Sequence, residues 1–238
     1  METHHFSLPR VAGWVPSRFQ QAPDQQLREF IRRRAFPCVG AKAALNGGGL
    51  RIENGGDIMN QVRNRELLAA LYDFIDAARD AESLVSFAVI FPESPLLTES
   101  QFETVLWRRL QALHDLDHAY GFRYDSAVDA DPASPEFALS FGGAAFFAVG
   151  LHPKASRASR RFIFPTIVLN LHRQFETLRH DGTYKKMRRS ILQRDNRICG
   201  TPNPMLKPHG HGSAAPQYSG RQVDAGWRCP FQPRGPAR

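Results

Sequence analysis

Three short apolar segments rich in β-branched and aromatic residues constrain the fold of this chain most strongly. They are residues 83–91, 144–150 and 162–171. Each has the length and composition of a buried strand, and none approaches the roughly 18 apolar residues of a membrane-spanning helix. Residues 137–141 precede the second segment across Gly142-Gly143, which predicts a hairpin. A sheet is therefore expected at the centre of the fold.

Helical patterns alternate with these strands. Residues 58–82 carry apolar side chains at helical spacing. Thr98 and Gln101 predict a capping box, and the helix after it would bury Phe102, Val105, Leu106, Leu110 and Leu113. Shorter helices are expected at residues 25–34, 173–180 and 184–196. Together these segments predict an α+β fold, a small central sheet with packed helices.

The two ends of the chain differ in composition from its middle. Residues 200–238 hold 6 Gly and 7 Pro in 39 residues, which excludes a long helix, yet the aromatic QYSG and GWRCPF segments predict a structured C-terminal wrap. Residues 1–24 show no apolar period and predict a loose arm. No linker divides the rest, so residues 25–238 are expected to form a single domain.

Composition limits the class of protein. The 42% apolar content excludes wholesale disorder. Three cysteines without paired spacing argue against a disulfide scaffold, and the first residues lack a secretory pattern. We therefore expect a cytoplasmic protein that does not enter the membrane. Phosphate-loop, dinucleotide-binding, GxSxG and HExxH motifs are missing from the sequence.

The net charge of +8 is unevenly distributed. Residues 151–198 hold 12 Lys and Arg against 3 Asp and Glu, whereas residues 1–150 hold 14 against 19. Such a segment suits an anionic cofactor, substrate or nucleic acid. Arg157, Arg160 and Arg161 lie near a predicted strand end, where their planar forks would suit carboxylates. No helix-turn-helix, finger or stacking motif accompanies the charge, so nucleic acid is not the expected partner.

Cys38 follows Pro37 at the start of a predicted short helix that ends at Asn46-Gly47. Free backbone N–H groups and the helix dipole stabilise a thiolate at such a position. Heme-thiolate enzymes use this geometry, because hydrogen bonds to the sulfur tune its donation to iron. Cys38 therefore fits a heme ligand, and it also fits a buried structural cysteine.

The histidines offer a second group of candidates. His152 and His172 each follow an apolar strand segment, where loops begin and sites are commonly built. Each is either a site residue or a hydrogen-bonded structural histidine. His114 and His118 lie four residues apart on a predicted helix, a spacing that can bind metal. No third ligand accompanies them, so a solvent-exposed polar face is expected there.

Several motifs in combination resemble the YqcI/YcgG family. They are FPCVGAKAAL, FFAVGLHPKASRASRRFIFPTIVLNLHRQFETLR, TYKKM, NPML, QYSGR and WRCPF, spread between Phe36 and Phe231. Members with assigned activity are heme-dependent guanidine N-hydroxylases that act on arginine or arginine-derived small molecules. The resemblance implies heme b, a guanidino substrate, and dioxygen or peroxide as oxidant. Because the chain has no flavin or nicotinamide fingerprint, an external electron donor or peroxide is expected.

The resemblance also implies site residues. Cys38 becomes the first candidate for the iron ligand, His152 the second and Cys229 the third. Further cofactor-binding positions that match the family motifs are Arg157, Asn170, Gln217, Tyr218 and Arg221. Arg161 is added as one of the arginines near the predicted strand end.

Glu176 and His172 are predicted as catalytic residues. They lie four residues apart, so a helix would place both on one face, and a carboxylate is needed to hold a buried guanidinium. A departure from the family pattern supports this choice. Where an acidic residue is expected before QYSGR, this chain has Ala214 and Ala215. Glu176 pairing only with Arg173 or Arg179 on the surface is the alternative. Heme binding without turnover, or nucleic-acid binding, are the alternative functions.

Overall fold

A computed structural model describes residues 21–81, 83–206 and 210–234. Its centre is a five-stranded mixed sheet with the order β1-β2-β5-β4-β3. β1 pairs with β2 in parallel, and the other neighbouring strands pair antiparallel. The strands are β1 (Leu50–Asn54), β2 (Ser86–Ile90), β3 (Leu139–Phe141), β4 (Ala144–Leu151) and β5 (Thr166–Leu171). This architecture confirms the predicted α+β class and the hairpin across Gly142-Gly143.

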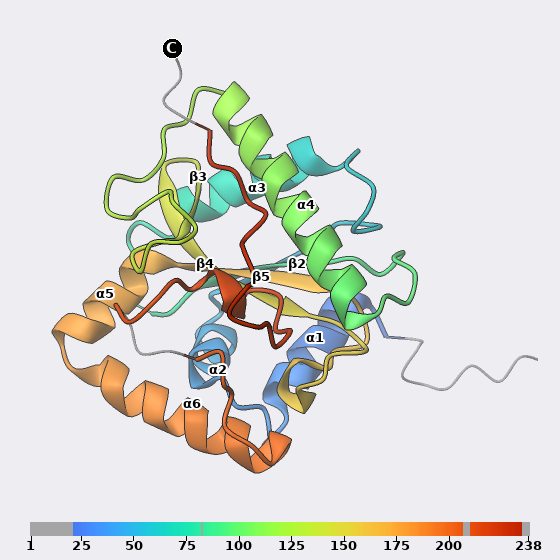
Figure 1. The fold of residues 1–238 in the computed structure, drawn as a ribbon, viewed down its shortest axis with the longest axis vertical. Helices are drawn as coiled ribbons and strands as arrows, with labels where there is room; N and C mark the ends of the chain where they lie inside the picture. Colours follow the sequence, from blue (N-terminus) through green and yellow to red (C-terminus); the bar gives the residue numbers. More distant parts are fainter. Residues whose placement is uncertain (1–20, 82, 207–209, 235–238) are drawn as a thin grey trace, which may run out of the picture.

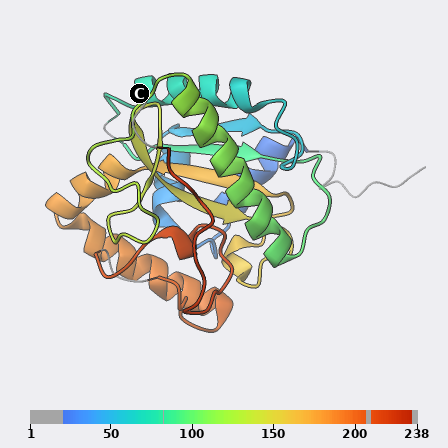
Figure 2. The same cartoon turned by 45° about the horizontal axis from the view of Figure 1, so that its top comes forward.

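Helices cover both faces of the sheet (Figures 1 and 2). α3 and α4 pack on one face, and α1 and α2 pack on the other, where α5 and α6 form an outer layer. The helices are α1 (Pro23–Arg32), α2 (Val39–Asn46), α3 (Asn64–Ala77), α4 (Glu99–Ala119), α5 (His172–His180) and α6 (Thr183–Cys199), with two short 3₁₀ turns, η2 (Ala158–Arg160) and η3 (Ala215–Gln217).

The alternation of side chains along β2 divides the core in two. Phe87 and Val89 join the larger apolar cluster under α3 and α4. Ala88 and Ile90 join the smaller cluster with α1 and α2. The predicted capping box at Thr98 and Gln101 is present at the start of α4.

One predicted helix is too long. Residues 58–82 were expected to be helical, but α3 begins only at Asn64. The segment before it forms turns because the buried guanidinium of Arg109 binds its carbonyl oxygens. Arg109 donates to Asp57 O at 2.9 Å and to Ile58 O at 2.7 and 3.1 Å. Val62, placed on the apolar face by its spacing, is 82% exposed.

The C-terminal segment follows the predicted wrap. β3 pairs only with the first residues of β4, so the later part of that β4 edge is free for the wrap. The backbone N–H of Gly150 in β4 donates to the Tyr218 carbonyl oxygen at 2.7 Å. Phe231 then packs into the cluster beside α4. In Figure 1 this segment, coloured red, crosses the front of the molecule and runs along α4.

The predicted N-terminal arm lies largely outside the described residues. α1 begins at Pro23, so the last two residues assigned to that arm, Pro23 and Asp24, belong to a helix. Within the part of the chain that the structure describes, no helix is both long and apolar enough to cross a membrane.

Candidate functional site

A cavity of about 300 Å³ lies on the α2 side of the sheet. Its floor is formed by the sheet, and the start of α2, the inner side of α6 and the C-terminal wrap enclose it. Apolar side chains dominate its lining, among them Phe36, Leu84, Phe137, Phe147, Val149, Leu151, Phe175, Met187, Ile191, Leu192 and Leu206. Such an apolar hollow with a few polar groups is the usual form of a small-molecule site.

Cys38 contributes a thiol to this cavity. It is the N-cap residue of α2, and its Sγ accepts a hydrogen bond from the Ala41 backbone N–H at 3.4 Å. Burial raises the pKa of the thiol, while the N–H groups of Ala41 and Gly40 and the charge of Arg160 act in the opposite direction. The prediction that Cys38 stands at a helix N-terminus is confirmed.

Three of the predicted site residues, Asn170, His172 and Gln217, also line the cavity. Asn170, on the sheet floor, accepts a hydrogen bond at Oδ1 from Ser86 Oγ at 2.8 Å. His172 is the first residue of α5, and its Nε2 lies 3.4 Å from Glu176 Oε1. The helical pairing of His172 with Glu176 is confirmed.

Three arginines give the cavity a positive lining: Arg160, Arg179 and Arg188. Arg160 donates from Nη1 to the carbonyl oxygens of Tyr218 at 3.1 Å and Gly150 at 3.3 Å. Burial lowers the pKa of Arg160 to about 10, so it remains charged at neutral pH. Arg188 donates from Nη2 to Leu206 O at 3.2 Å.

Two carboxylates line the cavity, Glu136 and Asp195. Asp195 is buried, accepts a hydrogen bond from Ser159 Oγ at 2.6 Å, and forms an ion pair with Arg157. The side chain therefore points inward from α6, toward the loop before β5. Glu136 is exposed and forms no ion pair with any residue that the structure describes.

His152 lies on the opposite side of the sheet from the cavity. Phe147, Val149 and Leu151 of β4 point toward the cavity, so the alternation of the strand turns the next residue away. The fully buried ring of His152 stacks on Phe102 of α4 with centroids 4.4 Å apart. Neither ring nitrogen has a hydrogen-bond partner among the described residues. Burial lowers its pKa to about 4, so the imidazole is neutral.

Cys229 and Tyr218 are not among the cavity-lining residues, although the Tyr218 ring packs edge-on against the cavity-lining Phe147 with centroids 5.1 Å apart. Cys229 lies against the larger core cluster, where burial raises its pKa to about 12. Tyr218 is fully buried and stacks on Trp107 with centroids 5.6 Å apart. The structure therefore does not bring together the three candidate iron ligands, and only Cys38 among them lines the cavity.

The remaining predicted arginines serve other contacts. Arg157 binds Asp195 and donates to Thr201 O at 2.9 Å. Arg161 donates to the carbonyl oxygens of Ala155 and Ser156 at 3.0 and 3.1 Å. Arg221 donates from Nε to Glu103 at 2.6 Å.

Glu176 is half-exposed and pairs with Arg179 as well as His172. It is not among the cavity-lining residues, although both of its partners are. The structure thus matches the surface pairing with Arg179 that the sequence left open. The expected exposed face at His114 is wrong. His114 is buried, and its Nε2 accepts a hydrogen bond from the Arg234 backbone N–H at 2.9 Å.

Sequence reasoning missed Glu136 and Arg188 as cavity residues. No spacing in the sequence connects Glu136 to Cys38. A long-range contact positions its loop, because Ser213 Oγ in the C-terminal wrap donates to Pro132 O at 2.6 Å. Arg188 shares the inward face of α6 with Met187 and Ile191. Residues three and four positions apart lie on the same side of a helix, so this spacing could have indicated its position.

A wider groove of about 980 Å³ lies between α3, α4 and the end of the wrap. None of the predicted site residues lines it. No group of three His, Cys, Asp or Glu side chains that could hold a metal ion occurs among the residues with described positions.

The chain is similar to known proteins over most of its length. The model of the YqcI/YcgG family matches residues 27–232. The protein YcgG of Bacillus subtilis (strain 168) is 26% identical over 195 residues, which cover 79% of this chain and 76% of that protein. No solved structure matches the chain.

Proposed function

This chain belongs to the YqcI/YcgG family, and we propose that it is a heme-dependent monooxygenase that N-hydroxylates the guanidino group of arginine or an arginine-derived small molecule. The observation that carries the proposal is the Cys38 thiol, which a helix start presents to an apolar cavity lined by arginines. The three cysteines of the chain are free, which suits a reducing cytoplasm.

The donor set of the cavity fits heme b. Apolar side chains suit the macrocycle, Cys38 supplies a sulfur ligand, and Arg160 and Arg188 supply planar partners for its carboxylates. A metal displaces the thiol proton, so the raised pKa of Cys38 is compatible with ligation. The Ala41 N–H would remain hydrogen-bonded to the sulfur and tune its donation.

The volume of the cavity is at the lower end of small-molecule sites, which span about 300–1,000 Å³. Heme therefore needs more room than the described arrangement gives. The wall formed by α5 and α6 can supply it, because Asp195 is the only buried residue of α6 and α5 has none. The Arg157–Asp195 ion pair still holds α6 to the loop before β5, so this wall would have to shift around that contact.

Bound heme supplies the activation of dioxygen or peroxide. The protein then has to orient the guanidinium, which needs a planar anion opposite it. We assign this role to Glu136, because it is the cavity carboxylate without an ion-pair partner among the described residues. Asp195 is already bound by Arg157 and Ser159. Glu176 then acts through Arg179, which it holds at the cavity wall, and His172 acts through its contact with Glu176.

The proposed reaction balances with a simple stoichiometry. One oxygen atom of dioxygen enters an N–H bond of the guanidinium, the other leaves as water, and two electrons and two protons are consumed. With hydrogen peroxide the same product and one water form without external electrons. An arginine at the cavity would bind the carboxylate of the substrate and fix which nitrogen is oxidised.

The test is expression with heme supply, followed by spectra of the oxidised, reduced and CO-bound protein and by turnover with arginine and related guanidines. A Soret band and a product heavier by one oxygen atom are expected. If the protein binds heme but forms no product with dioxygen or peroxide, the monooxygenase proposal is rejected and the alternative of a heme-binding protein without turnover is supported. Absence of heme binding, together with tight salt-sensitive DNA binding, would replace the proposal with nucleic-acid binding.

A further inference from the structure

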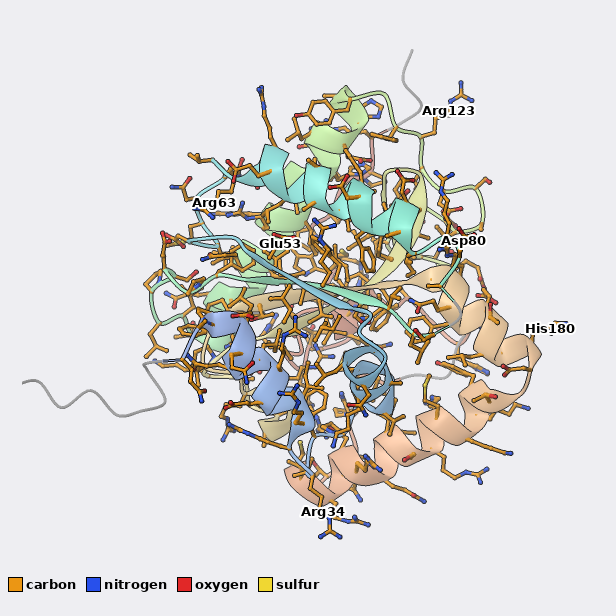
Figure 3. All side chains as sticks on the ribbon, turned by 180° about the vertical axis from the view of Figure 1, so that it is seen from behind. Arg34, Glu53, Arg63, Asp80, Arg123 and His180 are labelled. Atoms are coloured by element: carbon orange, nitrogen blue, oxygen red, sulfur yellow. The ribbon has the colours of Figure 1, made fainter. Side chains whose placement is uncertain are left out.

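The outward side of α6 carries a row of unneutralised cations, the basic face. Lys185, Lys186, Arg189 and Arg197 are exposed along it. The one acidic residue of this helix, Asp195, is buried and turned inward. Figure 3 shows nitrogen-tipped side chains extending from this helix into solvent.

The basic face continues beyond α6. α2 contacts α6, and burial together with the positive charge of Arg194 lowers the pKa of Lys42. Arg34, two residues after the end of α1, lies beside the end of α6 in Figure 3. No salt bridge joins these cations to a carboxylate within the described part of the chain. Like charges held together without counter-ions repel, which an acidic partner would relieve.

The same helix lines the cavity with its other side. Met187, Ile191 and Leu192 face inward. An α-helix with its side chains is about 10–12 Å across. A molecule bound on the basic face is therefore separated from the cavity by the thickness of one helix.

We propose that the basic face is the docking surface of a small acidic electron-transfer protein that delivers electrons to the cavity through α6. This proposal rests on the proposed function, because the reaction with dioxygen consumes two electrons. Two successive encounters with a one-electron carrier supply them, and each leaves one carrier oxidised. Charge complementarity of this kind speeds encounter and orients weak, transient complexes.

The composition of the basic face favours an acidic protein over a membrane or a nucleic acid. The large exposed apolar side chains among the described residues are Met59, Val62, Leu96, Tyr120, Phe122 and Ile163, and none lies on α1, α2 or α6. The face therefore lacks the apolar half that an interfacial helix inserts into lipid. It also lacks exposed aromatic side chains on which bases would stack.

The experiment compares two triple variants of equal charge. The first replaces Lys185, Lys186 and Arg189 by Glu. The second variant is the control, and it replaces Arg65, Arg108 and Arg123 by Glu. These three arginines are exposed on other parts of the molecule. Glu at positions 185 and 186 lies in the first turn of α6, where negative charge favours a helix, so folding should be preserved. Circular dichroism and thermal unfolding verify that both variants fold.

A plant-type [2Fe–2S] ferredoxin is the acidic probe. Its affinity is measured by calorimetry at low and high salt, and its support of turnover is compared with that of peroxide. The α6 variant should bind at least about tenfold more weakly and lose most of the salt dependence, while the control keeps both. Ferredoxin-supported turnover should fall with affinity, and peroxide-supported turnover should stay unchanged in both variants.

Equal binding by both variants, or no binding by the unmodified protein, would overturn the docking proposal while peroxide-supported turnover still upholds the proposed function. The protein could also bind ferredoxin in a salt-sensitive way that only the α6 variant loses, and yet take up no heme. That result would support the docking surface and reject the proposed heme-dependent activity. Tighter binding to a 20-base-pair duplex or to anionic vesicles than to ferredoxin, lost in the α6 variant, would assign the face to that partner instead.

Discussion

The Sγ atom of Cys38 lies 3.4 Å from the backbone nitrogen of Ala41 and accepts its hydrogen bond. This contact makes the sulfur both the cap of α2 and a group facing the cavity. Serine is a preferred N-cap residue, whereas alanine cannot cap. The two roles of Cys38 can therefore be separated by substitution.

Cys38→Ser should keep the helix cap, and Cys38→Ala should lower the free energy of unfolding by about 1 kcal/mol, measured by urea denaturation. Both variants should lose the strongly red-shifted Soret band of a ferrous–CO thiolate complex. A red-shifted band that survives in Cys38→Ser but disappears in Cys229→Ser would assign the iron to Cys229. An unmodified protein that binds heme without this band, and whose heme spectrum changes in His152→Phe or His172→Ala, would assign the iron to that histidine.

Arg157 and Asp195 tie α6 to the loop before β5. Their side chains are only 11% and 7% exposed, so removing one partner leaves a buried charge. Arg157→Ala should lower the free energy of unfolding by about 3–5 kcal/mol, and Arg157→Lys, which keeps the charge but loses the planar fork, should lower it less.

The exposed pair of Arg79 and Asp76 supplies the control. Its side chains are 69% and 68% exposed, so Arg79→Ala should change stability by no more than about 1 kcal/mol. If Arg157→Ala is as mild as this control, the ion pair does not hold α6. Heme retention lost in Arg157→Lys at unchanged stability would instead support the expected role of Arg157 in binding propionates.

The fold could largely be predicted from local patterns. The strands at 86–90 and 166–171, the hairpin and the Thr98 capping box all depend on residues close in sequence, where apolar period and turn chemistry act directly. The error before Asn64 has a distant cause, because Arg109, far along the chain, binds the carbonyl oxygens that a longer helix would use.

The site was less predictable, because strand alternation and loop packing decide it. His152 and Leu151 are adjacent in sequence, yet they face opposite sides of the sheet. Both histidines follow a strand, but only His172 lines the cavity. A position at the end of a strand is therefore not enough to tell which histidine faces the cavity. Glu136 and Gln217 meet the cavity through contacts between the 129–138 loop and the C-terminal wrap, which no short-range pattern encodes.

Substrate recognition is tested by two matched carboxylate variants. Glu136→Gln removes the negative charge at the cavity, and Glu176→Gln removes it from the adjoining helix pair. Glu136→Gln should abolish the spectral shift caused by arginine while leaving the heme spectrum unchanged. Glu176→Gln should weaken the shift only a few-fold, because it acts through Arg179.

The titration distinguishes the two assignments directly. Loss of the arginine shift in Glu176→Gln, with a normal shift in Glu136→Gln, would return the role to Glu176. A shift that persists in both variants would exclude a carboxylate at either position as the guanidinium partner. No shift in the unmodified protein would reject guanidines as the substrate class.

His152 should make the protein sensitive to acid. Burial lowers its pKa from 6.5 to about 4, so between these values the unfolded chain binds a proton that the folded protein does not. Stability therefore falls as pH drops from about 6.5 to 4, by about 3 kcal/mol in total. The buried His114, whose pKa is also lowered by burial, acts in the same direction.

His152→Phe should keep the stacking on Phe102 and remove the part of this slope that His152 contributes. Since neither ring nitrogen has a hydrogen-bond partner among the described residues, the substitution should cost little at pH 7.5. Urea unfolding at pH 7.5 and pH 5 should show a smaller loss of stability in His152→Phe than in the unmodified protein. An unchanged slope in His152→Phe would show that His152 gains no proton on unfolding, and hence that it is not held neutral in the core.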